Sequence, residues 1–175
     1  MRHFFTLILS LTVVLMAAAQ TPQVIEIAQQ EDDDGNVVCG VYDVPVGGRH
    51  CYWLCVGPLG IGDDTVQVFA DPLFKLFVPL GMSLREALVT MDDIQSLLRA
   101  AVGSTLETDG CLSPALPTGR LEPVRIMHRK PLLSHVLEFR VEREGYVRAT
   151  HIQKSDFAPL VSGMKLYRRM HRDLQ

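Results

Sequence analysis

The sequence predicts an α+β domain, with a mostly antiparallel sheet built from two hairpins, packed by one amphipathic central helix and a C-terminal helix, and stapled by disulfides. Three observations lead to this fold class. Two pairs of strand-like runs each flank a short glycine-containing segment, as in β-hairpins. A serine-capped run with three-four apolar spacing indicates a helix between them. Four cysteines follow an apolar N-terminal segment that directs export, and cysteines of exported proteins usually pair.

Residues 1–19 have the pattern of a signal peptide, with Arg2 near the start, an almost unbroken apolar run, and alanines at positions 17–19 as a cleavage site. The apolar segment, residues 4–19, is shorter than the roughly 20 residues that a spanning helix needs. We therefore expect cleavage, a mature chain that begins near Gln20, and localisation in the periplasm, as in short exported proteins of Gram-negative bacteria. Retention of the segment would instead anchor the chain to a membrane.

Residues 20–36 are expected to form an N-terminal strand and an acidic turn, and residues 37–175 a single α+β domain. The turn contains four consecutive carboxylates, residues 31–34, which repel one another and favour a solvated surface position. Gln30 and Val41 occupy the positions where a calcium loop centred on Gly35 would need acids. We expect no metal there, with a weak cation site as the alternative.

The first predicted hairpin pairs residues 37–43 with residues 50–56 around Pro45-Val46-Gly47-Gly48. A three-residue loop, 46–48, places Cys39 opposite Cys55 and puts six residues on one face, because side chains alternate along a strand. These are Cys39, Val41, Asp43, Cys51, Trp53 and Cys55. This register predicts a disulfide between Cys39 and Cys55, which leaves Cys51 for Cys111. Each disulfide would contribute roughly 2 to 4 kcal/mol.

Between the hairpins we expect, in order, a loop, a strand, an edge strand or helical turn, the central helix and a long loop. These occupy residues 57–64, 65–70, 73–80, 83–102 and 103–119. Ser83 and Glu86 form a capping box at the helix start, and Gly103 is expected to end the helix. A bridge at Cys111 would anchor the long loop.

A strand at residues 121–128 precedes the second hairpin, which pairs residues 134–142 with 146–153 around a loop at 143–145. This register places Leu137, Phe139, Val141, Val147, Ala149 and His151 on one face, with Glu138, Arg140, Glu142, Tyr146 and Arg148 opposite. The final helix is expected to begin at Ser155 or Asp156. Its basic end contains Lys165, Arg168, Arg169 and Arg172, which either stabilise the helix dipole or form a basic contact surface.

Charge divides the chain unevenly. Residues 20–119 carry four Lys/Arg against fourteen Asp/Glu, a net charge of −10, whereas residues 120–175 carry twelve against six, a net of +6. The two parts either face one another within the fold or present a dipolar surface to a partner, such as anionic lipid headgroups or an acidic protein. We expect no nucleic-acid partner in an exported protein. We also expect no nucleotide, because the glycine-rich residues 57–64 lack the phosphate-binding spacing.

Catalytic and metal chemistry is not favoured. His50, Cys51 and Cys55 fit part of a zinc-binding spacing, but disulfides are favoured over zinc in an oxidising compartment. No hydrolase motif is present in the sequence. His128, His135 and His151 lie on predicted neighbouring strands and could approach one another, without a nucleophile beside them. We therefore expect no catalytic residue, no metal and no cofactor.

These observations favour an exported, disulfide-containing domain that acts as a non-catalytic binding or structural protein for an unidentified protein partner. The first alternative is an accessory subunit docked on, or anchored to, a membrane protein complex. The second alternative is a periplasmic thiol-redox or hydrolytic enzyme that uses Cys51 or Cys55.

Overall fold

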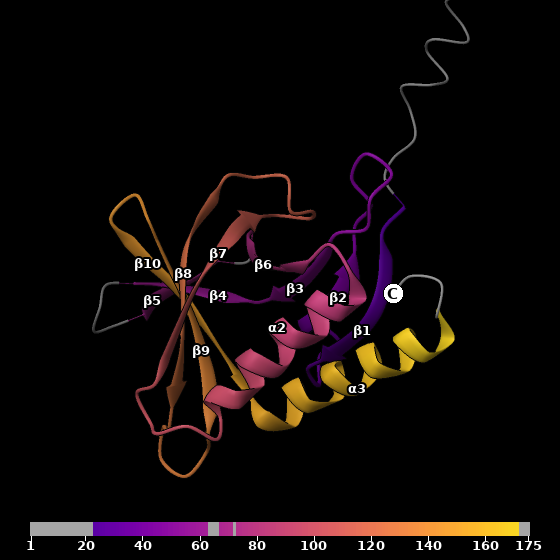
Figure 1. Ribbon diagram of the computed structural model, residues 1–175. Helices are drawn as coiled ribbons and strands as arrows, with labels where there is room; N and C mark the ends of the chain where they lie inside the picture. The colour runs from indigo at the N-terminus through magenta and orange to yellow at the C-terminus, as the bar shows by residue number, and fades with distance from the viewer. Residues whose placement is uncertain (1–22, 63–66, 72, 172–175) are drawn as a thin grey trace, which may run out of the picture.

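The computed structural model describes residues 23–62, 67–71 and 73–171. Over these residues it confirms the mixed α+β fold, with ten strands in one antiparallel sheet and two helices (Figure 1). The elements are β1 (Ile25–Glu31), β2 (Val37–Asp43), β3 (Tyr52–Val56), β4 (Leu59–Gly62), β5 (Gln67–Asp71), β6 (Lys75–Gly81), α2 (Leu84–Leu97), β7 (Thr105–Ser113), β8 (Leu121–Arg129), β9 (Val136–Arg143), β10 (Tyr146–Gln153) and α3 (Lys154–Met170). The predicted signal peptide and Arg172 lie outside the described residues.

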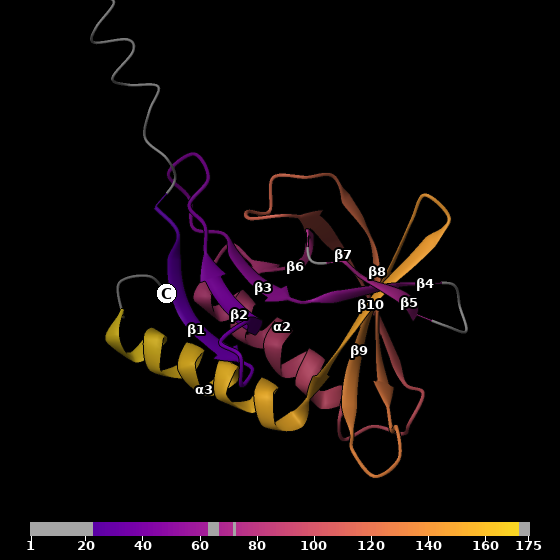
Figure 2. The same ribbon diagram turned by 180° about the vertical axis from the view of Figure 1, so that it is seen from behind.

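The sheet curls back on itself. Its strand order is β1-β2-β3-β6-β7-β8-β9-β10-β4-β5. Only Gly57 and Pro58 separate β3 from β4, yet β4 pairs with β10 at the far side of the order, where Gly60 lies opposite Ala149. Strands β3 and β4 therefore lie at opposite ends of the series β3-β6-β7-β8-β9-β10-β4, although they are almost continuous in the chain. Their short connection closes this series into a barrel-like body (Figure 2). Strands β1 and β2 extend the sheet beyond this body.

Helices α2 and α3 lie side by side against the sheet and bury its main core (Figures 1 and 2). Both helices direct an apolar stripe into this core. Their buried residues are Leu84, Ala87, Leu88, Met91, Ile94 and Leu97 in α2, and Phe157, Leu160, Val161, Met164 and Tyr167 in α3. A Cβ atom added to Gly163 would lie 2.6 Å from the Cβ atom of Ala28. Glycine at this position therefore lets α3 approach β1 closely.

Ser83 and Glu86 cap the start of α2 as predicted, although the Glu86 carboxylate bonds the amide of the residue before the N-cap. The Glu86 amide donates to the Ser83 hydroxyl at 3.2 Å, and the Glu86 carboxylate accepts from the Met82 amide at 2.8 Å. The helix ends at Leu97, earlier than the predicted residue 102. Gly103 has a φ of 92° and donates its amide proton to the carbonyl of His128, so it lies in the connection to β7 and does not end the helix.

Three intervening segments differ from the prediction. Most of the expected loop at 103–119 is strand β7, and the expected loop at 57–64 contains β4. The segment expected to be an edge strand or helical turn is β6, which lies between β3 and β7. The acidic residues and the glycine of β7 are uncommon in strands, and for this reason the sequence did not predict a strand there. Gly110 is nevertheless suited to it, because an added Cβ atom there would lie 2.5 Å from Val124 Cγ2.

The register of the first hairpin is shifted by one residue from the prediction. Val46 pairs with Arg49, and the loop consists of Gly47 and Gly48 alone, with φ values of 58° and 78°. Two successive positive φ values are those of a type I′ turn, which matches the twist of paired strands. As a result Cys39 lies opposite Val56 rather than Cys55. A one-residue slip exchanges the two faces, so the single face predicted for Cys39, Val41, Asp43, Cys51, Trp53 and Cys55 is wrong.

The four cysteines are free, so the structure does not support the predicted disulfide staples Cys39–Cys55 and Cys51–Cys111. Cys39 faces the main core, where its sulfur lies 3.9 Å from the carbonyl oxygen of Asp156. Cys55 and Cys111 lie in a separate small cluster, on either side of Phe77, which pairs with both. The aromatic residue therefore occupies the strand between the two sulfurs, and Cys51 is partly exposed.

The second hairpin has the same one-residue shift. Arg143 pairs with Tyr146, and Glu144 and Gly145 form the loop with φ values of 57° and 77°. The core-facing residues 137, 139 and 141 therefore lie opposite residues 152, 150 and 148, not opposite the predicted residues 151, 149 and 147. The shift also places His151 directly opposite Glu138. The predicted faces of this hairpin are thus corrected.

Candidate functional site

Of the apolar side chains that the structure describes, the most exposed lie in the connection between β8 and β9, residues 130–135, which we call the tip. Leu132 is 96% exposed and Leu133 is 90% exposed. Leu132 also has a φ of 55°, in the left-handed region that a leucine rarely adopts. A hydrogen bond from the Ser134 amide to the Pro131 carbonyl closes the turn. The backbone thus holds two adjacent leucines away from the protein.

A pair of histidines fixes the base of the tip. His128 is buried, with Nδ1 3.0 Å from the carbonyl oxygen of Ala100 and Nε2 2.7 Å from Nδ1 of His135. A carbonyl only accepts, so His128 donates from Nδ1, and its Nε2 shares a hydrogen bond with Nδ1 of His135. Desolvation, and then the positive charges of Lys130 and His128, lower the pKa of His135. This hydrogen-bonded pair joins the tip to the end of α2.

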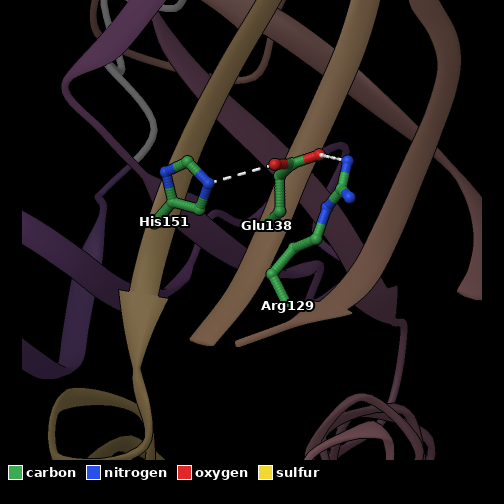
Figure 3. Close-up of polar contacts among 3 residues, drawn as sticks. All are labelled: Arg129, Glu138 and His151. Carbon is green, nitrogen blue, oxygen red and sulfur yellow. Dashed lines mark hydrogen bonds and ion pairs between the residues drawn. The ribbon is translucent and has the colours of Figure 1, made fainter. Parts of the chain in front are cut away.

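An ionic cluster lies beside the tip on the outer face of the sheet (Figure 3). Glu138 accepts from His151 Nε2 at 3.0 Å and pairs with Arg129 at 3.5 Å. The hydrogen bond from His151, aided by the charge of Arg129, lowers the pKa of Glu138 although burial opposes this. The Glu138 side chain is only 11% exposed. Glu138 is therefore held in its ionised form, and Arg129 and His151 compensate its negative charge.

Two lysines near the tip have no such compensation. Within the described part of the chain, no carboxylate lies within ion-pair distance of Lys130 or Lys154. Lys130 belongs to the tip, and Lys154 follows Gln153, which pairs with Val136 directly after the tip. The tip therefore has uncompensated positive charge beside it.

The structure brings only some of the sequence candidates together. His128 and His135 meet as anticipated, whereas His151 faces Glu138. The sequence reasoning did not single out Leu132 or Leu133. The available signal was a pair of leucines between a proline and a serine, directly after two basic residues, in a segment too short for an element of its own.

The basic end of α3 is a separate surface. Lys165 pairs with Asp92 of α2 at 3.6 Å, while Arg168 and Arg169 are exposed. Lys154, near the tip, is the first residue of this 17-residue helix. A helix of that length spans about 25 Å, so the tip and the basic C-terminal end are not one patch.

A second polar cluster lies where β2 and β3 are joined. Asp43 is fully buried, and its Oδ2 lies 2.6 Å from Nδ1 of His50. Its Oδ1 and the hydroxyl of the neighbouring Tyr52 have no hydrogen-bond partner. Burial, and then the charge of Asp43, raises the pKa of Tyr52. The carboxylate orients the imidazole, but no serine or cysteine of the described residues is hydrogen-bonded to His50.

Thiol and metal chemistry find little support in the described residues. Burial raises the pKa of Cys55 to about 11 and that of Cys39 to about 12, so both are protonated and weakly nucleophilic at neutral pH. No group of three His, Cys, Asp or Glu side chains in the described ranges could hold a metal ion. A polar groove of about 700 Å³ lies near the opposite end of β9, where Arg143 approaches Glu122 at 3.6 Å.

No family model, curated protein or solved structure matches this chain. Among the described helices, neither is long and apolar enough to cross a membrane. The inference about function therefore depends on the geometry of the tip and the charges around it.

Proposed function

We propose that this protein is an exported, non-catalytic binding domain that contacts its partner through the tip. The observation that carries the proposal is the near-complete exposure of Leu132 and Leu133. Each leucine would contribute roughly 1.5 to 3 kcal/mol if a partner buried it fully. A left-handed leucine also costs about 1 to 2 kcal/mol in the free protein. Strain of this kind at an exposed apolar apex is typical of a contact site.

The surrounding structure supports a binding role. The histidine pair, of which His128 is buried, ties the tip to the end of α2, so the leucines are presented from a fixed base rather than from a long loop. Cys55, one of the two cysteines that a redox or hydrolytic enzyme would use, is not activated, since burial raises its pKa. A preorganised apolar apex reduces the entropy that binding costs.

Export is the second part of the proposal. The N-terminal pattern of residues 1–19 supports cleavage before Gln20 and release into the periplasm. N-terminal sequencing of the protein from a periplasmic extract should begin near Gln20. Recovery of the chain with Met1 intact in the membrane fraction would support the anchored accessory subunit instead, for which the exposed Arg168 and Arg169 offer a contact surface.

Site-specific photo-crosslinking tests whether the tip is a contact surface. The photoreactive residue p-benzoylphenylalanine is placed at position 133 of the full chain and irradiated in the producing cells. The control position is Val46, which is 60% exposed on the first hairpin. Position 133 should give adducts and position 46 should not. Folded protein that forms no adduct from position 133, or forms the same adducts from both positions, would contradict the proposal.

A further inference from the structure

Resting on the proposed role of the tip, we propose that its partner is the surface of an anionic lipid bilayer, into which Leu132 and Leu133 insert while nearby cations contact the headgroups. The two leucines form the apex. Lys130 lies in the same connection, and Lys154 follows directly after β10. An apolar centre surrounded by cations matches the order of chemistries in a bilayer, where anionic headgroups border hydrocarbon.

A second loop contributes to the same end of the molecule. Figures 1 and 2 show the connection from α2 to β7 beside the connection from β8 to β9. The amide of Gly103 donates to the His128 carbonyl, and His128 in turn donates to the Ala100 carbonyl. Val102, between these two anchors, is 54% exposed. The docking end therefore has a third apolar side chain, held by the hydrogen bonds that fix the histidine pair.

The local charge balance favours anionic lipid. Lys130 and Lys154 have no carboxylate partner in the described ranges, and Arg99 near the end of α2 is exposed. Glu138, the acidic side chain that lies beside the tip, is already compensated by Arg129 and His151. The field at the tip is thus positive, and an anionic surface would attract it.

The shape of the tip also favours a bilayer over a folded protein. The leucines protrude from a hairpin, whereas the described grooves lie elsewhere on the molecule, along β7, β8 and the β9–β10 turn or beside the start of α2. A protruding apex needs a partner that can close around it. Fluid lipid does so without a preformed pocket, and Lys side chains can extend from the interface to the headgroups.

Vesicle flotation tests the lipid proposal with the mature chain purified from the periplasm. The probes are phosphatidylcholine vesicles with and without about a quarter phosphatidylglycerol, which suffices for a negative surface potential. The chain should float with the anionic vesicles and much less with the neutral ones. Replacing both leucines, Leu132→Ser with Leu133→Ser, should weaken binding at least about 10-fold. Lys130→Gln should weaken it by up to about fivefold and reduce its dependence on salt.

The matched control replaces two exposed valines elsewhere, Val46→Ser with Val89→Ser, and should bind like the wild type. Circular dichroism checks that each variant is folded. We expect folded variants, because the replaced side chains are exposed. Equal flotation of the leucine variant and the wild type, or no flotation with anionic vesicles, would overturn the lipid proposal. If position 133 then crosslinks to a protein in cells, the tip remains a binding surface and only its lipid partner is wrong. If position 133 crosslinks to nothing, the proposed function itself fails.

Discussion

The two ends of β9 use the same unusual backbone conformation for different purposes. At one end, Glu144 and Gly145 have positive φ values and close the hairpin to β10 in a polar two-residue turn. At the other end, Leu132 has a positive φ in a longer connection, with no glycine beside it and with its side chain in solvent. The turn serves the strand pairing, whereas the tip displays apolar surface. A positive φ alone therefore does not distinguish a structural turn from a contact site, and the exposure and polarity of the side chain decide between them.

The largest expected effect comes from removing the base of the tip. His128→Leu should lower the free energy of unfolding by about 1 to 3 kcal/mol, because the Ala100 carbonyl and His135 both lose a buried partner. The matched change at the turn end, Glu144→Ala, affects an exposed side chain and should stay within about 0.5 kcal/mol. Urea denaturation measures both. Equal losses of unfolding free energy in the two variants would mean that the hydrogen bonds of His128 do not stabilise the base of the tip.

The two left-handed positions should respond with opposite signs. Gly145→Val should destabilise the fold by about 1 to 2 kcal/mol, because a β-branched side chain is strained at a φ of 77°. Leu132→Gly should leave stability unchanged or raise it by up to about 1 kcal/mol, since relief of strain is partly offset by the greater freedom of the unfolded chain. Thermal unfolding of the two variants checks the signs. A clear loss of stability in Leu132→Gly would show that this leucine packs within the monomer.

The ionic cluster should make stability depend on acid pH. The folded-state pKa of Glu138 lies below its ordinary value of 4.5, so its contribution is present above that value and is lost as the pH falls through the folded-state pKa. Glu138→Gln should therefore flatten the pH dependence of the unfolding free energy in this acidic range. Glu142→Gln, nearer the turn end of β9, is the matched removal of a carboxylate. An unchanged pH profile in Glu138→Gln would rule out the cluster as its source.

The smallest effect concerns the chemical reactivity of the four cysteines. Without reductant, Cys51 should react with a thiol reagent in the native protein, because it is partly exposed, and all four cysteines should react after unfolding. Mass spectrometry counts the modified thiols. A mass lighter by two or four hydrogens, with fewer reactive thiols, would instead show that exported protein carries one or two disulfides.

Much of the fold followed from local patterns, and register did not. The glycines at 47–48 and 145 located both hairpins, and Ser83 with Glu86 located the start of α2. A choice between two and three loop residues then decided which side chains meet. That single residue removed the expected contact of Cys39 with Cys55 and created the contact of Glu138 with His151.

The candidate site was harder to predict because exposure is a property of the folded chain. A pair of leucines in a sequence is compatible with either a buried or an exposed loop, and only the tertiary structure shows that nothing covers Leu132 and Leu133. The approach of His128 to His135 could be anticipated from neighbouring strands. Its link to Ala100 could not, since it depends on where α2 ends.

The edge strand β1 limits the ways in which this molecule can associate. Its pairing with β2 is interrupted by irregularities between Glu26 and Ala28 and between Gln30 and Glu31, and α3 packs across it. An irregular, acidic border is a poor template for the backbone ladder that drives aggregation between sheets. The protein can therefore expose leucines at the tip, while the β1 edge of its sheet resists pairing with the sheet of another molecule.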